Sequence, residues 1–207
     1  MKKKYDYWYW RNFISKENIK KINESEPVYH YVNNGIRLGL HDKPAPNITK
    51  TSKVTFLSYE KIKKYLQNAV LNCYISNKER FGYKLFDYEE QFLHYNIYSS
   101  DNKGQYDWHT DSEEYFSLDI KLTVLINVSE EPYEGGQFKL NATGSPMEIN
   151  ELSNPGDMIM FKSHILHKVE PVTKGTRKSL TIFLKGPDFK WKQLYWDHRA
   201  QEKQLRC

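Results

Sequence analysis

The spacing between apolar residues differs in two parts of the chain. Over residues 59–77, apolar side chains recur at three- and four-residue spacing, which predicts an amphipathic helix that Ser58 caps. Ser15 is a candidate N-cap for a shorter helix over residues 16–24. After Gly82 the period changes to two, which is typical of strands with one buried face. We therefore expect helices from the first third of the chain and a sheet from the remainder.

The segments with the two-residue period are short and numerous. Turn sequences rich in Gly, Asn and Pro separate them, as between antiparallel strands joined by tight turns. This spacing predicts a mainly β fold, with a double-stranded β-helix (jelly-roll) core that the N-terminal helices brace. The expected strands are residues 5–13 (an edge strand), 91–99, 118–128, 136–140, 146–152, 157–162, 167–172 and 177–184.

A length of 207 residues favours a single domain, over residues 1–207. We expect a helical and loop-rich support region over residues 1–87, the jelly-roll core over residues 88–187 and a C-terminal extension over residues 188–207. Residues 25–58 are rich in Pro, Gly and Asn, which predicts loops and short strands. That stretch is either a lid or substrate-binding region or an ordinary surface excursion.

Composition narrows the classes of function. Two cysteines, Cys73 and Cys207, are too few for a disulfide framework and indicate a reducing compartment. No apolar run reaches the roughly eighteen residues of a transmembrane helix, and no secretory signal follows Met1, so we expect a cytoplasmic protein. The net charge of +5 is spread along the chain, which favours a solvated basic surface over a nucleic-acid site.

His109 and Asp111 are the first residues that suggest a chemistry. Side chains two positions apart leave an extended strand on the same face, so this pair can share a metal ion. Two histidines and a carboxylate on one face of an octahedral ion form the facial triad of non-heme Fe(II) oxygenases. His167 is the candidate for the second histidine. His164 would point to the other strand face, and we expect it on the surface or behind a ligand.

Arg177 and Ser179 also share a strand face. A guanidinium donates two parallel hydrogen bonds to a carboxylate, and a hydroxyl two residues further on can donate a third. The sequence thus combines a metal site with a carboxylate receptor. That combination suits a small keto acid with two carboxylates, which chelates the metal at one end and is gripped at the other.

Four motifs of the chain resemble those of the Fe(II)/2-oxoglutarate-dependent dioxygenases. The similarity is greatest to the prolyl-4-hydroxylase-like branch, which includes bacterial and phage PKHD-type hydroxylases. It covers residues 88–187 in the family's order and spacing, while residues 1–87 match only loosely. The motifs are Tyr-Asp-Trp-His-Thr-Asp (106–111), Glu-Gly-Gly-Gln-Phe (134–138), Pro-Gly-Asp-Met-Ile-Met-Phe (155–161) and His-Lys-Val-Glu-Pro-Val-Thr-Lys-Gly-Thr-Arg (167–177).

The resemblance implies roles for individual residues. Arg177 would bind the distal carboxylate of 2-oxoglutarate, with Ser179 beside it. A tyrosine upstream of the metal motif would contact the same co-substrate; Tyr98 and Tyr95 compete for that role, and we favour Tyr98. Dioxygen would be the oxidant, with ascorbate as a candidate reductant. The implied ligands of Fe(II) are His109, Asp111 and His167.

The implied reaction couples oxidative decarboxylation of 2-oxoglutarate, to succinate and CO2, with hydroxylation of an aliphatic C–H bond. The expected substrate is a prolyl or other residue of a protein or peptide, or a free amino acid. The alternatives are oxidative demethylation of nucleic acid, which uses the same triad, and a jelly-roll binding module without catalysis. The single arginine clamp argues against the first alternative, and the intact ligand set against the second. Residues 25–58 and the loop over residues 99–105 would supply the substrate surface.

Overall fold

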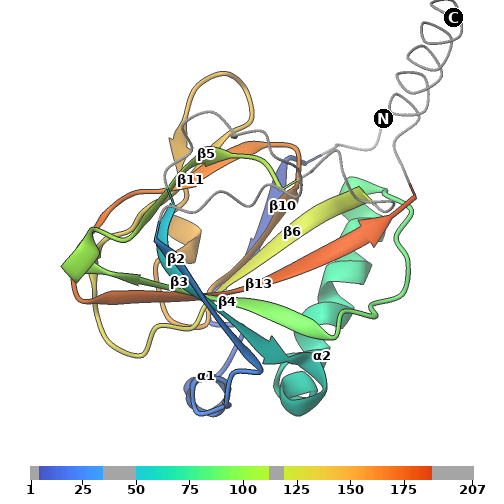
Figure 1. Cartoon of the computed structure of the whole chain (residues 1–207). Coiled ribbons are helices and arrows are strands. Elements are labelled where there is room, and N and C mark those ends of the chain that lie inside the picture. Colours follow the sequence, from blue (N-terminus) through green and yellow to red (C-terminus); the bar gives the residue numbers. More distant parts are fainter. Residues whose placement is uncertain (1–4, 35–49, 112–118, 188–207) are drawn as a thin grey trace, which may run out of the picture.

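A computed structural model, which describes residues 5–34, 50–111 and 119–187, shows a mainly β chain with two main helices (Figure 1). The helices are α1 (Lys16–Asn23) and α2 (Tyr59–Ser76), with a π-helical turn over Asn77–Phe81 and 3-10 turns over Ser100–Asn102 (η2) and Asn150–Leu152 (η3). The strands are β1 (Tyr7–Trp10), β2 (Tyr29–Asn34), β3 (Lys50–Ser58), β4 (Phe92–Ser99), β5 (Gln105–His109), β6 (Asp119–Asn127), β7 (Glu134–Gly135), β8 (Phe138–Asn141), β9 (Met147–Glu148), β10 (Met158–Lys162), β11 (Leu166–Val169), β12 (Val172–Lys174) and β13 (Thr176–Gly186).

One antiparallel sheet holds most of the strands and curls into a barrel, which confirms the predicted jelly roll (Figure 1). Its order is β1-β10-β6-β13-β4-β3-β5-β11-β8-β9, with β2 added to the side of β3, while β12 and β7 form a separate pair. Strand β3 connects the two halves of the sheet, because its later residues pair with β4 and its first two pair with β5. The half formed by β5 and β11 therefore lies across from the half formed by β13 and β4.

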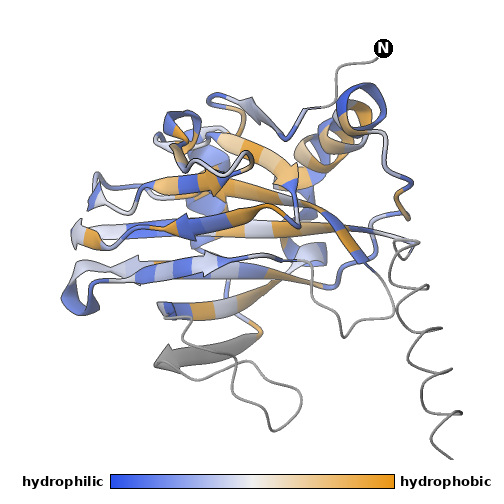
Figure 2. Ribbon diagram, turned by 90° about the horizontal axis from the view of Figure 1, so that it is seen from above, coloured by the Kyte–Doolittle hydropathy of each residue, from blue (hydrophilic) through white to orange (hydrophobic). Residues whose placement is uncertain are grey.

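The outer face of the larger half packs against the helices. Figure 2 shows the helices on one side of the layered strands, with hydrophobic stretches on the strands nearest to them. The predicted stripe of α2 is buried in this layer, where alternate residues of β6 and β13 meet it. Full burial of one such aliphatic side chain contributes roughly 1.5–3 kcal/mol. The buried members from these three elements are Ile62, Leu66, Ala69, Val70, Cys73, Leu122, Val124, Ile126, Leu180, Ile182 and Leu184.

A second apolar cluster lies inside the barrel. Alternation along each strand separates the two clusters: Leu125 points inward on β6, between Val124 and Ile126, which point to the helices. Both halves of the sheet contribute to the inner cluster, among them Phe161 of β10 and Phe138 of β8. The inner cluster occupies only part of the barrel, and the polar side chains of the candidate site share the same inner face.

Both predicted helices are confirmed, with small differences at their ends. The Ser15 side chain accepts a hydrogen bond of 3.2 Å from the backbone N–H of Asn18, as an N-cap does. Ser58 occupies the N-cap position of α2, but its side chain makes no capping hydrogen bond. After α2, the π-helical turn continues to Gly82, whose φ of +74° ends the helix in the left-handed region.

Two of the predicted strands are partly wrong. Over residues 146–152 only Met147–Glu148 pairs as a strand, and Asn150–Leu152 forms a 3-10 turn. The strand predicted over residues 167–172 is divided into β11 and β12, because Pro171 has no backbone N–H to donate to the ladder.

The region expected to hold loops and short strands contains the nine-residue strand β3, which is an integral part of the barrel. Residues 35–49 of that region and the predicted C-terminal extension lie outside the described residues. The division of the chain into a support region, core and extension stays a prediction.

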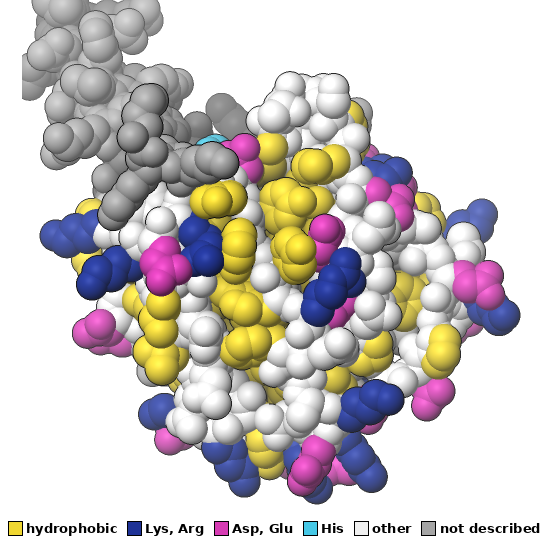
Figure 3. All heavy atoms as spheres, turned by 180° about the vertical axis from the view of Figure 1, so that it is seen from behind, with side chains coloured by type: hydrophobic (Ala, Val, Ile, Leu, Met, Phe, Trp, Pro, Cys, Tyr) yellow, Lys and Arg dark blue, Asp and Glu magenta, His cyan; other side chains and the backbone are white. Residues whose placement is uncertain are grey.

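The charged side chains are scattered on the face opposite to that of Figure 1. Figure 3 shows an apolar band across this face, with Lys, Arg, Asp and Glu side chains intermixed around it. Because both signs alternate there, the described side chains of this face form no continuous basic stripe. Within residues 5–34, 50–111 and 119–187, no helix has the length and apolar composition needed to cross a membrane.

Candidate functional site

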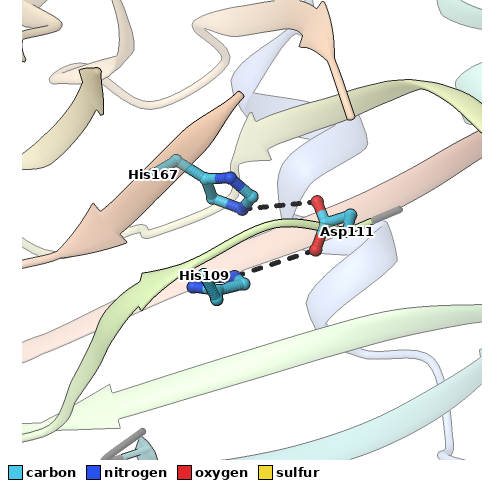
Figure 4. A group of neighbouring side chains, drawn as sticks. All are labelled: His109, Asp111 and His167. Atoms are coloured by element: carbon cyan, nitrogen blue, oxygen red, sulfur yellow. Dashed lines mark ion pairs between the residues drawn. The ribbon is translucent and has the colours of Figure 1, made fainter. Parts of the chain in front are cut away.

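Three side chains that are far apart in the sequence meet at the end of β5. His109 is the last residue of β5, Asp111 follows two residues later, and His167 lies on β11 directly across from His109. The Nε2 atom of His109 lies 3.7 Å from Oδ1 of Asp111, and the Nε2 atom of His167 lies 3.3 Å from its Oδ2. Figure 4 shows the two rings pointing toward this carboxylate from adjacent strands.

These three residues meet the geometric and chemical needs of a facial metal site. One ligand atom from each lies within 4.8 Å of the others. Ligands that bind an ion at about 2.1 Å and at right angles to one another are about 3 Å apart, close to the separations found here. The Nδ1 atom of His109 donates to the carbonyl of Asp107 at 2.7 Å, and that of His167 donates to the carbonyl of Ile165 at 2.9 Å. Each Nε2 atom therefore keeps its lone pair for a metal.

The protonation states also suit a cation. Burial and the neighbouring His167 lower the pKa of His109 to about 3, so its imidazole is neutral at physiological pH. Burial by itself would raise the pKa of Asp111. His167, His109 and a hydrogen bond from Thr123 outweigh burial and hold that pKa below its ordinary value. A metal ion would thus meet a carboxylate and a neutral ligand nitrogen without first displacing protons from them.

Arg177 forms a separate anion-binding position inside the barrel. Its side chain is only 2% exposed, as is that of Ser179, and its Nη1 atom donates to Ser179 Oγ at 3.3 Å. No carboxylate among the described residues forms an ion pair with this guanidinium. A buried charge without a counter-ion is unfavourable, so this site has a strong preference for an anion. A carboxylate of 2-oxoglutarate has the required charge and shape.

Tyr98 and Tyr95 lie on opposite faces of β4. Tyr98 is directly across from Arg177 on β13, and its ring centroid is 5.4 Å from the guanidinium carbon. Tyr95 packs in the outer cluster, and its hydroxyl donates a 2.5 Å hydrogen bond to Asn23. Burial raises the pKa of Tyr98 to about 12, so its hydroxyl remains a hydrogen-bond donor. Of the two tyrosines, only Tyr98 shares the interior with Arg177.

The glycine pair that follows Glu134 packs against the arginine. Gly136 has a φ of +64°, and a Cβ atom added there would lie 2.9 Å from Cδ of Arg177. A cavity of about 380 Å³ adjoins the same guanidinium, lined by residues 133–138 and by residues near η3. The Gly-Gly sequence is thus a tight turn with a specific purpose, since it leaves room for the Arg177 side chain.

Two neighbours of the metal ligands were not predicted from the sequence. Thr123 Oγ1 donates a 2.7 Å hydrogen bond to Asp111, and the Tyr106 ring stacks on that of His109 with 3.4 Å between centroids. Tyr106 and His109 are three residues apart and share a face because β5 has a bulge there, where two of its residues oppose one of β11. In a regular strand, residues three positions apart point to opposite faces, so the sequence did not predict that these two rings would stack. His164 is exposed, in agreement with the surface position expected for it.

Comparisons with known proteins agree with this geometry. The family model of the 2OG-Fe(II) oxygenase superfamily matches residues 91–185, which contain all three candidate metal ligands and Arg177. A PKHD-type hydroxylase of Colwellia psychrerythraea is 29% identical over 125 residues, covering 57% of this chain and 55% of that protein. Another from Crocosphaera subtropica is 23% identical over 181 residues, covering 80% of this chain and 72% of that protein. The chain thus spans about half the length of the Colwellia relative.

Solved structures show the same fold at low sequence identity. A prolyl-4-hydroxylase of Pseudomonas putida superposes with a TM-score of 0.60 at 17% identity, covering 88% of this chain and 94% of that one. A viral collagen prolyl hydroxylase of Paramecium Bursaria Chlorella virus-1 superposes with a TM-score of 0.62 at 16% identity, covering 88% and 97%. By its matched domain, its relatives and its fold, this chain is similar to the 2OG-Fe(II) oxygenase superfamily, and within it to the PKHD-type and prolyl-4-hydroxylase branch.

Proposed function

We propose that this protein is an Fe(II)- and 2-oxoglutarate-dependent hydroxylase that oxidises an aliphatic C–H bond. The observation that carries the proposal is the buried guanidinium of Arg177, which has no acidic partner among the described residues and lies in the same barrel as the three candidate metal ligands. A metal site alone would suit many proteins, but a metal site with a buried receptor for a second carboxylate suits a chelating keto diacid. The match of residues 91–185 to the family model of the 2OG-Fe(II) oxygenase superfamily supports the same conclusion.

In this proposal the side chains divide into two groups. Arg177 and Ser179 bind the distal carboxylate of 2-oxoglutarate, and Tyr98 donates a further hydrogen bond to it. When bound, Fe(II) and 2-oxoglutarate supply the activation of dioxygen and release succinate and CO2, with ascorbate as a candidate reductant of the iron. The residues that hold the iron are His109, Asp111 and His167.

The surrounding residues keep the ligands oriented and the site dry. The backbone carbonyls behind the two histidines fix the ring orientation, and Thr123 fixes the carboxylate of Asp111. The rings of Phe161 and Phe138 lie 4.8 Å and 5.8 Å from the His167 ring and cover it with apolar surface. Such a shell limits access of water to the ligands.

The proposed substrate is a prolyl or other residue of a peptide or protein, or a free amino acid. The names of the relatives support this class: a prolyl hydroxylase of Trichoplax adhaerens, in complex with a peptide fragment of hypoxia inducible factor, superposes with a TM-score of 0.62. Its sequence identity to this chain is 15%, so the likeness concerns the fold, and the substrate class is our proposal.

An anaerobic titration tests the co-substrate half of the proposal. Adding Fe(II) and then 2-oxoglutarate to the purified protein should produce a visible metal-to-ligand charge-transfer band that saturates at one equivalent of each. The absence of this band from correctly folded protein would contradict the proposal.

Two histidine variants test the residue assignment. His109→Ala should abolish the band and the formation of succinate, because one of three ligands is lost. His164→Ala is the matched control, since His164 is an exposed histidine close to the site in sequence, and it should retain both. Equal loss in the two variants would show that the ligands are assigned incorrectly.

A further inference from the structure

Along β13 and β4, the side chains on the inner face of the barrel are buried at one end and more exposed at the other. On β13, Arg177, Ser179 and Thr181 point inward and are buried, while Phe183 is half-buried. On β4, Asn96 is buried, and His94, two residues further from Arg177, is half-buried. Six residues of strand separate Arg177 from Phe183, which is about 20 Å. The closed end of the barrel therefore holds the arginine, and the opposite end is the mouth.

The candidate metal ligands lie at the level of the mouth. Asp111 accepts a hydrogen bond from Thr123, which lies directly across from Phe183 in the sheet. A co-substrate that reaches from the metal to Arg177 would extend toward the closed end. A substrate must then approach the metal from the mouth, so polar side chains that lack partners there are candidates for contact with it.

His94 is one such side chain at the mouth. Its ring lies edge-on between the rings of Phe56, at 4.8 Å, and Phe183, at 5.2 Å. Within the described part of the chain, neither ring nitrogen of His94 makes a hydrogen bond. Burial and the nearby Lys50 lower the pKa of His94 to about 4, so the ring is neutral and offers one donor and one acceptor. The two phenyl rings hold it in place, but no described side chain uses its nitrogens.

Lys50 is a second polar side chain beside the candidate metal ligands. Its ammonium lies 4.3 Å from the centroid of the Tyr106 ring, and that ring stacks on His109. No ion pair or hydrogen bond joins this ammonium to another of the described residues, although lysines elsewhere pair, such as Lys162 with Asp6. Burial lowers the pKa of Lys50 to about 8, and the Asp111 carboxylate opposes that effect. The side chain is therefore mostly charged at neutral pH and lies beside the metal site without a dedicated anion.

Ser52 lies two residues after Lys50 on β3, on the same face of the strand. Alternation places Lys50, Ser52 and Phe56 on one face of the strand, and Phe56 identifies that face as the inner one through its contact with His94. The Ser52 hydroxyl is buried and has no hydrogen-bond partner among the described residues. A cation with a hydroxyl two residues further on repeats, on β3, the arrangement of Arg177 and Ser179 on β13.

We propose that Lys50 and His94 form a second carboxylate-binding subsite beside the candidate metal ligands, so that the substrate carries a carboxylate near the carbon that is oxidised. This inference rests on the proposed hydroxylase function. One ammonium and one neutral imidazole suit a single negative charge, and the nearby Asp111 disfavours a doubly charged phosphate. The carboxylate is either the α-carboxylate of a free or C-terminal amino acid or the side chain of an acidic residue within a peptide.

Binding to the protein loaded with Mn(II) and 2-oxoglutarate tests the subsite without turnover. Paramagnetic Mn(II) enhances the proton relaxation of small molecules bound near it, and three probes distinguish the sources of the carboxylate. Acetyl-proline has an α-carboxylate, acetyl-prolyl-aspartate α-amide has only a side-chain carboxylate, and acetyl-proline amide has none. At least one acid should show saturable enhancement, with an affinity roughly tenfold or more above that of the neutral amide, as loss of a charge-assisted hydrogen bond implies.

Variants connect the effect to the two residues. Lys50→Met should weaken binding of the preferred acid roughly tenfold or more, Lys50→Arg should keep most of it, and His94→Phe should weaken it severalfold. Lys53→Met is the matched control, because Lys53 is exposed on the opposite face of the same strand. Relaxation of the 2-oxoglutarate protons reports folding and co-substrate binding in each variant, and it should stay at the wild-type value.

Several results would overturn the subsite. The first is equal affinity of the wild-type protein for the acids and the amide, and the second is no relaxation enhancement for either acid. The third is unchanged binding of the acid in Lys50→Met, which would mean that the acid coordinates the metal directly. Loss of 2-oxoglutarate binding in Lys50→Met would show that the ammonium serves the co-substrate instead. A wild-type protein that binds neither Mn(II) nor 2-oxoglutarate would contradict the proposed function itself.

Discussion

The Oγ1 atom of Thr123 donates a 2.7 Å hydrogen bond to Oδ2 of Asp111, the same oxygen that faces His167. Asp111 lies just beyond the end of β5, where no strand pairing holds its side chain, so this hydroxyl from the neighbouring half of the barrel restrains it. The orientation of the only carboxylate in the candidate triad thus depends on a residue of a different strand.

Replacing that hydroxyl should weaken metal binding without unfolding the protein. Thr123→Val keeps the shape of the side chain and removes the donor, so we expect an affinity for Fe(II) or Mn(II) that is roughly 10–100-fold lower. Metal titration followed by calorimetry measures the change, and Thr123→Ser, which keeps the hydroxyl, should stay within a few-fold of wild type. Equal metal affinity in all three proteins would mean that Thr123 does not position Asp111.

Removing the buried guanidinium should weaken 2-oxoglutarate binding without lowering the stability of the free protein. Arg177→Met eliminates the anion receptor, so 2-oxoglutarate binding should fall at least 100-fold, as expected for a buried bidentate pair. The free energy of unfolding without co-substrate should not decrease, because an uncompensated buried charge is replaced by an apolar chain of similar length. Denaturant unfolding with and without 2-oxoglutarate checks both statements. A large loss of stability in the free protein would show that Arg177 has a structural partner.

Gly136→Ala should disturb the arginine through sterics. The added methyl group would lie 2.9 Å from Cδ of Arg177, at a φ of +64° that disfavours any side chain. We expect weaker 2-oxoglutarate binding, by roughly tenfold, together with a cost in stability of about 1–2 kcal/mol. Gly144→Ala is the control: its φ is +88°, but nothing lies within 4 Å of the new methyl group, so only the backbone cost should appear. The same loss of affinity in both variants would exclude a steric effect on Arg177.

The helical layer should matter for stability and leave the site chemistry intact. Leu66 is fully buried against the sheet, so Leu66→Ala should reduce the free energy of unfolding by about 2–5 kcal/mol. Leu71 of the same helix is 57% exposed, and Leu71→Ala should change it by no more than about 0.5 kcal/mol. Urea denaturation measures both. If the two variants are equally destabilised, the packing of α2 has been assigned to the wrong face.

The free protein should lose stability as the pH falls from about 6.5 to 4. His94 has a pKa of about 4 in the folded state, where burial, Lys50 and Lys185 disfavour its charged form and Asp111 favours it. Its pKa in the unfolded chain is about 6.5. The unfolded state therefore takes up a proton first, and the stabilisation that is complete above pH 6.5 declines as the pH falls toward 4.

For this half-buried ring the contribution should be about 1–2 kcal/mol over that range. Urea midpoints of the metal-free protein, measured at several pH values, would show the decline. His94→Phe cannot be protonated and should have a flatter dependence. A wild-type curve as flat as that of the variant would mean that the folded protein protonates His94 freely.

Much of this protein is readable from local patterns. The change of period after Gly82 predicts the order of helices and strands, because burying one face demands a spacing of 3.6 residues in a helix and of two in a strand. Motif spacing identified the residues of the candidate site, including Arg177 and Ser179. The structure brings the three candidate ligands together because β11 lies beside β5.

Other features depended on the tertiary structure, because they arise between strands that are distant along the chain. The sequence does not show which of Tyr98 and Tyr95 points into the barrel. The helices cover the face of β4 that holds Tyr95, so Tyr98 faces Arg177. Thr123, Lys50 and His94 carry no motif. They become neighbours of the candidate metal site because the sheet curls and brings β6, β3 and β4 to one interior. Periodicity records which face of a strand is buried, but only the closed barrel determines which side chains meet inside it.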